Sequence, residues 1–235
     1  MTVQATPGAG CGGVRHHRIR HRAPPKRHTG AMSISYGAHV ADDSELRLCG
    51  DLAGKRAIEL GMSSAGAASA AGGSVAPNSL VMAQAGAKTI AVHPDAQAIA
   101  GLRAAAERAE VTVQCQQGDL ADLGFATSAS VDLVLAVHSL AEVDDLPRLL
   151  RQVHRVLKPG APFVVAMRHP VAAMFGHDTT AQYAYGAATP TFADLYMAFE
   201  RSNFHLDQVH ELADRRVRDP LTPSVLVLRA RKQGV

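Results

Sequence analysis

Residues 131–165 restrict the fold more than any other part of the chain, because two apolar runs flank a helix pattern. Val131–Val137 is apolar with one polar interruption, which is typical of a strand buried on both faces of a sheet. Between residues 146 and 157, leucine and valine recur at spacings of three and four, which predicts an amphipathic helix. Lys158-Pro159-Gly160 ends that helix, and Phe163–Met167 is a second buried strand. Two buried strands joined by a helix predict a parallel pair.

Strand and helix patterns alternate along most of the remaining chain. Further strands are predicted at residues 55–61, 89–92, 111–115, 204–212 and 224–230, and further helices at 78–87, 95–109 and 191–202. This order indicates an α/β fold: a Rossmann-like, doubly wound, mostly parallel seven-stranded sheet with an antiparallel C-terminal strand. Sheets of this kind bind ligands beyond the carboxyl ends of their strands.

Composition excludes several other classes of protein. With 47% hydrophobic and 19% charged residues, the 235-residue chain can bury a core and is not disordered throughout. The three cysteines lie far apart, which excludes a disulfide scaffold and a cysteine-based zinc site, and no metal is expected. No apolar stretch approaches the roughly 18 residues of a membrane span, so we expect a soluble protein of the cytoplasm.

The first 30 residues differ from the rest in charge. They contain six of the 24 Lys and Arg residues and none of the 21 Asp and Glu residues, so the remainder is mildly acidic. Gly, Pro, Arg and His without apolar periodicity predict a disordered basic tail over 1–30 and one folded domain over 31–235. Two alternatives stay open for the tail: an electrostatic anchor to nucleic acid or acidic membrane, or a segment that precedes a true start at Met32.

The order of these elements resembles the class I S-adenosylmethionine-dependent methyltransferases, in particular the branch whose compact domain acts on small molecules. The resemblance spans about Ser33 to Lys232 and is most specific over VDLVLAVHSLAEVDDLPRLLRQVHRVLKPGAPFVV, residues 131–165. It implies S-adenosyl-L-methionine as the cofactor and methyl transfer to a small-molecule acceptor. The sequence makes no prediction of the oligomeric state.

The family's first motif is an acidic strand end followed by a glycine-rich turn beside the methionine part of the cofactor. Glu59-Leu60-Gly61 matches it, and the resemblance implies cofactor contacts for Glu59, Gly61 and Met62. Gly61 suits a place where the backbone approaches a ligand without a Cβ atom between them. Glu59 instead braces the loop in the alternative interpretation. The turn departs from the family, because Gly-x-Gly is missing and residues 62–77 form a loop roughly ten residues longer.

The second motif places a carboxylate on the cofactor's ribose, and here His93 stands at that position. Neutral imidazole offers one acceptor where a carboxylate offers several. Asp95 either substitutes for the missing acid or caps the next helix. The third motif, Gly118-Asp119-Leu120, matches the family, which implies that the Asp119 carboxylate accepts a hydrogen bond from the adenine amino group.

Methyl transfer depends mostly on aligning the acceptor with the methyl group, and a base is needed only where the acceptor loses a proton. His138 and His169 each follow a buried strand and are the candidate bases, because histidine titrates near neutrality. Both also fit a purely structural role. The resemblance adds two weaker cofactor contacts, Val137 at the fourth strand's end and Tyr36 in the N-terminal segment.

Other functions fit the sequence less well. A nicotinamide dehydrogenase needs Gly-x-Gly-x-x-Gly after its first strand, and a phosphate-binding loop needs Ser or Thr after Gly-Lys; neither is present. The segment that starts at His138 lacks the Asn/Asp-Pro-Pro-aromatic loop of nucleic-acid amino methyltransferases, so a nucleic-acid substrate is not expected. The serious alternative is a catalytically degenerate methyltransferase fold that acts as a binding or scaffolding module. Both departures, at residues 62–77 and at His93, fall on the cofactor site.

Overall fold

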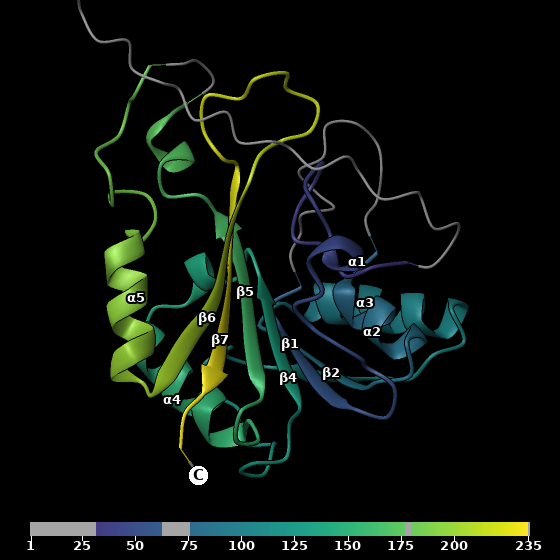
Figure 1. The fold of residues 1–235 in the computed structure, drawn as a ribbon. Coiled ribbons are helices and arrows are strands. Elements are labelled where there is room, and N and C mark those ends of the chain that lie inside the picture. The colour runs from purple at the N-terminus through teal and green to yellow at the C-terminus, as the bar shows by residue number, and fades with distance from the viewer. Residues whose placement is uncertain (1–31, 63–75, 177–179, 235) are drawn as a thin grey trace, which may run out of the picture. The chain divides into compact units, whose positions relative to one another are not determined.

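The central feature of the computed structural model is one seven-stranded sheet, and the structure describes residues 32–62, 76–176 and 180–234 (Figure 1). The strand order is β3-β2-β1-β4-β5-β7-β6. The strands are β1 (Arg56–Leu60), β2 (Lys88–His93), β3 (Val113–Gln117), β4 (Leu133–Val137), β5 (Pro162–Arg168), β6 (Phe204–Leu212) and β7 (Val225–Lys232). Strands β1 to β5 pair in parallel, and β7 runs antiparallel to both β5 and β6. The predicted fold class is confirmed.

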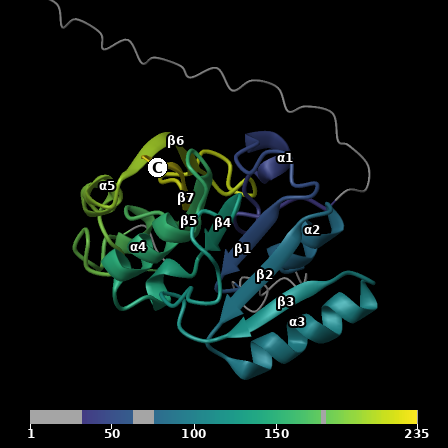
Figure 2. The same ribbon diagram turned by 90° about the horizontal axis from the view of Figure 1, so that it is seen from below.

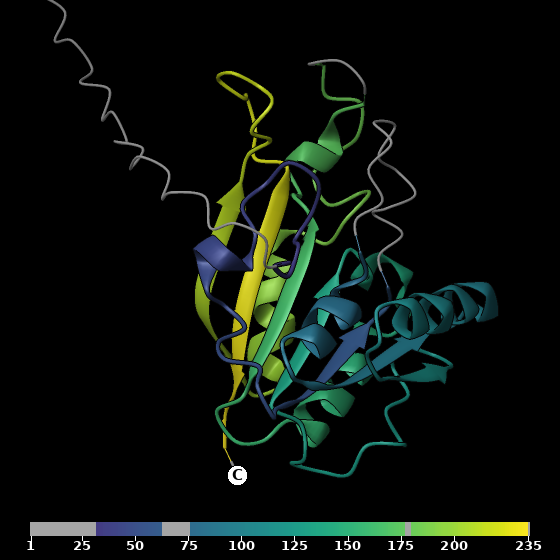
Figure 3. The same cartoon turned by 90° about the vertical axis from the view of Figure 1, so that its right-hand side faces the viewer.

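Helices cover both faces of the sheet (Figure 2). They are α1 (Asp43–Leu46), α2 (Asn78–Gln84), α3 (Ala96–Arg108), α4 (Leu146–Val156) and α5 (Phe192–Arg201), with short 3₁₀ turns η2 (Leu140–Glu142) and η3 (Ala172–Met174). Helices α4 and α5 pack on one face, while α2, α3 and the N-terminal segment that holds α1 pack on the other, as Figure 3 also shows.

Side-chain caps explain where three of the helices begin. Asp95 accepts hydrogen bonds from two backbone N–H groups at the start of α3, and Asp145 accepts one at the start of α4. At α5, Thr191 and Asp194 form a reciprocal capping box. Each cap satisfies N–H groups that have no partner within the helix, which is why the sequence predicted these starts within one residue.

Two of the element boundaries that differ from the prediction lie at or directly after the end of a helix. The helix predicted to reach residue 87 ends at Gln84, because the chain turns through Gly86 at a φ of 86° and Ala87 N–H donates to the Met82 carbonyl. The strand predicted at 111–115 is Val113–Gln117 instead, because Val111 N–H donates to Ala106 and still belongs to the end of α3. Both shifts arise from turns that close a helix C-terminus.

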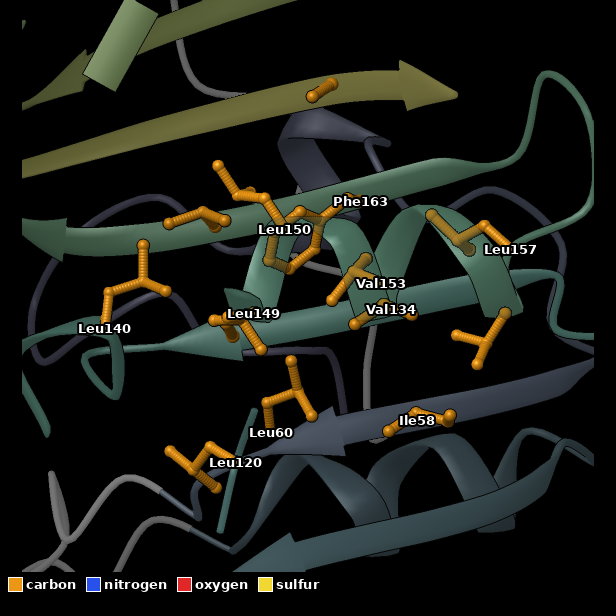
Figure 4. Packing of buried hydrophobic residues seen from close by; sticks show 14 of the residues in the cluster. Ile58, Leu60, Leu120, Val134, Leu140, Leu149, Leu150, Val153, Leu157 and Phe163 are labelled. Atoms are coloured by element: carbon orange, nitrogen blue, oxygen red, sulfur yellow. The ribbon is translucent and has the colours of Figure 1, made fainter. Parts of the chain in front are cut away.

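The larger core lies between the sheet and helices α4 and α5 (Figure 4). Leu149, Leu150 and Val153 of α4 point onto the strands, where Ile58 and Val134 are fully buried. The side chains of Leu120 and Leu140, from two loops at the carboxyl edge, join the same cluster. The core thus extends to the carboxyl ends of the strands, and it holds the loops that follow them in place.

None of the helices in the described ranges is long and apolar enough to cross a membrane. The described residues also contain no group of three or more His, Cys, Asp or Glu side chains that could hold a metal ion. The tail predicted over 1–30 lies outside the described residues, as does 63–75 of the predicted long loop.

We expect Phe199→Ala to lower the free energy of unfolding by about 3–5 kcal/mol. Phe199 is fully buried on α5, and its ring centroid lies 5.8 Å from that of Phe163 and 5.9 Å from that of Phe204. Phe192→Ala is the matched control, since this residue lies on the same helix and is 39% exposed. Its cost should stay below about 1 kcal/mol in denaturant titrations. Equal losses from the two variants would contradict the packing described here.

Candidate functional site

A cavity of about 460 Å³ opens beyond the carboxyl ends of β2 and β3. Its lining residues are Pro94, Gln117, Gly118, Asp119, Leu120 and Glu142. The loops after the two strands meet there, because Gly118 N–H donates to the His93 carbonyl at 3.1 Å. The sequence pointed to Gly118, Asp119 and Leu120, and it missed the other three. Pro94 and Gln117 adjoin predicted positions, whereas Glu142 carries no local motif that could have revealed it.

Asp119 presents an oriented but accessible carboxylate to this cavity. Its Oδ1 accepts a hydrogen bond from Ala121 N–H at 2.9 Å, and Nη1 of Arg148 lies 3.6 Å from Oδ2. The side chain is 56% exposed, so each oxygen keeps room for a further donor. Leu120, the next residue, is buried and anchors the loop in the core.

Gly61 lies at the end of β1 with a φ of 66°, a conformation that favours glycine. A Cβ atom here would lie 2.3 Å from Cβ of Ser139. The Ser139 hydroxyl donates to the Leu60 carbonyl at 2.5 Å, so the loop after β4 crosses directly over the end of β1. The sequence analysis assigned this glycine to the approach of a ligand. The structure shows that contact with Ser139 already requires a glycine here.

Glu59 is a buried brace for the start of α2. Its Oε2 accepts a hydrogen bond from Ser79 N–H at 2.6 Å, while the helix's own cap position, Pro77, makes no side-chain bond. The Glu59 carboxylate on β1 therefore satisfies an N–H group in the first turn of α2, as a capping side chain next to the helix would do. Burial raises the pKa of Glu59 to about 7, against the opposing effect of its bonds to Ser79 and Asn78. The loop-bracing alternative describes this geometry.

His93 and Asp95 bond to the backbone beside the cavity. Nδ1 of His93 accepts a hydrogen bond from Asp95 N–H at 3.0 Å, which leaves the ring's proton on Nε2 when the ring is neutral. Both carboxylate oxygens of Asp95 accept N–H groups of α3, from Gln97 at 2.9 Å and Ala98 at 3.3 Å. The helix-capping interpretation of Asp95 describes its place, because both of its oxygens bond to the first turn of α3.

His138 follows β4 and holds a left-handed backbone, with a φ of 56°. Its Nε2 lies 3.0 Å from the carbonyl oxygen of Tyr36, which can only accept, so Nε2 carries the proton and Nδ1 the free lone pair. Nδ1 has no hydrogen-bond partner among the residues that the structure describes. Burial lowers the pKa of His138 below its ordinary value, and the bond to Tyr36 partly offsets that effect.

His169 differs from His138 because both of its ring nitrogens are engaged. Nδ1 accepts Val171 N–H at 3.1 Å, and Nε2 lies 2.9 Å from Oε1 of Glu211. The ring is almost fully buried, with an exposed fraction of 5%. A base needs a free lone pair, so this arrangement matches the structural alternative for His169.

Three predicted cofactor contacts are buried side chains. The Tyr36 ring is inaccessible, and its hydroxyl donates to Oδ1 of Asp43 at 2.6 Å. Met62 packs in the cluster between α2 and α3, and Val137 packs in the cluster on the same face that includes the N-terminal segment. In this arrangement, Tyr36 can reach a ligand only through its backbone, and its role in binding stays a prediction.

The residues of the cavity fit the nucleoside end of S-adenosylmethionine in part. Asp119 offers an acceptor for an amino group, and a Cβ added at Gly118 would meet nothing within 4 Å, so there is space beside it. His93 offers a donor where the family offers acceptors. Of the turn expected beside the methionine end, Gly61 and Met62 are described, whereas residues 63–75 of the loop that follows lie outside the described residues.

The raised pKa of Glu59 predicts a pH-dependent stability. A carboxyl that titrates near 7 in the folded state and near 4.5 when unfolded contributes stability that is fully present below pH 4.5. That contribution is lost as the pH rises through 7, and it amounts to about 3 kcal/mol. Denaturant titrations between pH 4.5 and 8 should show this decline in the native protein and a flatter profile in Glu59→Gln. Parallel profiles would contradict the assignment.

The environment of His138 predicts a neutral ring at pH 7 with the proton on Nε2. Nitrogen NMR of labelled histidines should show this tautomer, with a midpoint below 6.5, and His138→Gln identifies the signal. A midpoint at or above 6.5, or a proton on Nδ1, would contradict the described geometry.

Comparisons with known proteins agree with this architecture. Residues 70–165 match the sequence model of a family described as "Methyltransferase domain". A crystal structure of an S-adenosylmethionine-dependent methyltransferase from Mesorhizobium loti superposes with a TM-score of 0.63 at 20% identity, and the match covers 80% of this chain and 95% of that one. A methyltransferase structure from Listeria monocytogenes superposes with a TM-score of 0.60 at 16% identity, over 80% of this chain and 95% of that one.

A curated relative has a different named activity. The mitochondrial arginine-hydroxylase NDUFAF5 of Danio rerio is 41% identical over 58 residues, which are 25% of this chain and only 18% of that protein. The family match, the strand order and the solved structures nevertheless agree with one another. Residues 70–165 thus match a methyltransferase domain, the whole sheet has the fold of the class I S-adenosylmethionine-dependent methyltransferases, and S-adenosylmethionine is the cofactor that this likeness implies.

Proposed function

We propose that the protein transfers the methyl group of S-adenosylmethionine to a small-molecule acceptor. The observation that carries this proposal is the cavity beyond β2 and β3, which the accessible Asp119 carboxylate enters. This is the edge at which sheets of this order bind nucleotides. Gly118, Asp119 and Leu120 hold the base end, with Asp119 as acceptor for an amino group.

The bound cofactor supplies a sulfonium that already activates its methyl group, so the protein's main task is alignment. His138 can take the proton that an acceptor hydroxyl or amine loses, since its Nδ1 lone pair is free and its ring is neutral at pH 7. The bond from Nε2 to the Tyr36 carbonyl fixes the direction of the ring. His169 lacks a free lone pair in this arrangement and positions the loop after β5 instead.

A small acceptor is favoured by the short segment over the carboxyl edge between β5 and α5. Within it, Tyr183 and Tyr185 expose about half of their surfaces, while residues 177–179 lie outside the described residues. The hydroxylase relative raises a protein arginine as an alternative acceptor. An acceptor screen therefore includes arginine peptides beside small hydroxyl and amine compounds.

One observation favours a second function, that of a binding module without catalysis. The carboxylate nearest to the end of β2, Asp95, caps α3 with both of its oxygens, and His93 presents a donor at the position where the family has a carboxylate. A lost charged hydrogen bond costs about 1.5–3 kcal/mol, or roughly ten- to a hundredfold in affinity. Cofactor affinity therefore discriminates between the two functions.

Calorimetric titration with S-adenosylmethionine and S-adenosylhomocysteine tests the proposal. We expect micromolar binding to the native protein and an affinity about ten- to a hundredfold lower for Asp119→Asn, which keeps an oxygen for the Ala121 bond. Asp122→Asn is the control, because Asp122 lies in the same loop, also accepts a backbone bond and does not line the cavity. A folded protein that binds neither ligand at millimolar concentration would refute catalysis and support the binding module.

A further inference from the structure

Glu142 is the second carboxylate that lines the cavity, and no motif of the sequence assigns it a role. It ends the 3₁₀ turn η2, which begins immediately after Ser139. Its side chain is exposed and has no hydrogen bond or ion pair within the described ranges. A carboxylate that stabilises nothing in the protein but faces a cavity is available to a ligand.

The position of Glu142 is held by its neighbours. Its N–H donates to the Ser139 carbonyl at 3.1 Å, which closes the turn. Leu140, two residues earlier, is buried in the same cluster as Leu120 (Figure 4). The loops that carry Glu142 and Asp119 are thereby anchored in the same core, and both residues line one cavity.

The cavity's lining selects for hydrogen-bond donors. Two carboxylates line it, whereas no Lys or Arg is among its lining residues. Nη1 of Arg148 lies 3.6 Å from Oδ2 of Asp119, and Ala121 N–H donates to Oδ1. The Asp119 carboxylate is therefore already partly engaged within the protein. A ligand group with two polar hydrogens therefore meets one partly engaged acceptor and one free acceptor.

We propose that Glu142 acts with Asp119 as the second acceptor for the exocyclic amino group of the cofactor's base, and so makes this chain selective for an amino purine over a keto purine. An amino group carries two hydrogens and can serve both carboxylates. A keto oxygen at the same position would face both carboxylates without a hydrogen to donate, so Glu142 would gain no partner from it. This inference rests on the proposed function, because it assumes that the nucleoside occupies this cavity.

The test compares S-adenosylhomocysteine with S-inosylhomocysteine, in which a keto oxygen replaces the amino group. Titrations use the full chain, the variants Glu142→Ala and Glu142→Gln, and the control Asp144→Ala. Asp144 is an exposed carboxylate two residues away that does not line the cavity and does not cap α4. Because both side chains are exposed, these substitutions should leave the fold intact.

We expect Glu142→Ala to bind S-adenosylhomocysteine at least tenfold more weakly and S-inosylhomocysteine no more weakly than the native protein does. The affinity of Glu142→Gln for S-adenosylhomocysteine should lie between those of Glu142→Ala and the native protein, since its amide keeps an acceptor without the charge. The affinity of Asp144→Ala should match that of the native protein. Native affinity for S-adenosylhomocysteine in Glu142→Ala would overturn the role of Glu142 while leaving the proposed function intact. A native protein that binds neither nucleoside would overturn both.

Discussion

The close crossing of Gly61 and Ser139 is the contact on which the arrangement of the site depends. Strand order reverses between β1 and β4, because the chain builds outward from β1 toward β3 and from β4 toward β6. The loops that leave β1 and β4 therefore diverge from a single point, and the Ser139 hydroxyl ties them together through the Leu60 carbonyl. Only a residue without a Cβ atom fits beneath Ser139. Glu142 and the loop of Asp119 take their positions from the same packed edge.

Of four carboxylates around this edge, two bond to the start of a helix and two line the cavity. Glu59 braces α2 from within the core, and Asp95 caps α3, so both carboxylates bond to the start of a helix. Asp119 and Glu142 remain at the cavity. These two acceptors thus lie at the cavity, whereas His93 presents a donor beside it. Under the proposed function, this distribution favours recognition of the cofactor through its base over recognition through its ribose.

Much of the fold could be predicted because its signals are local. Asp95, Asp145 and Thr191 begin helices through bonds to residues two or three positions away, and the β4 run is apolar because both faces are covered. Asp119 was also recognisable, since it follows a strand in a short motif. The shift of β3 to Val113–Gln117 could not be predicted, because it depends on how α3 closes its last turn.

By itself, the sequence determined the order of strands and helices, the helix starts and the third motif at Asp119, because periodicity and capping act over a few residues. Only the tertiary structure decided which candidate side chains are free. Glu211, 42 residues from His169, engages one nitrogen of that ring, and Tyr36, 102 residues from His138, fixes the tautomer of the second candidate base. Glu142 and Asp119 line one cavity for the same reason. Hydrogen-bond partners at such separations are set by the packing of the sheet, and no local pattern encodes them.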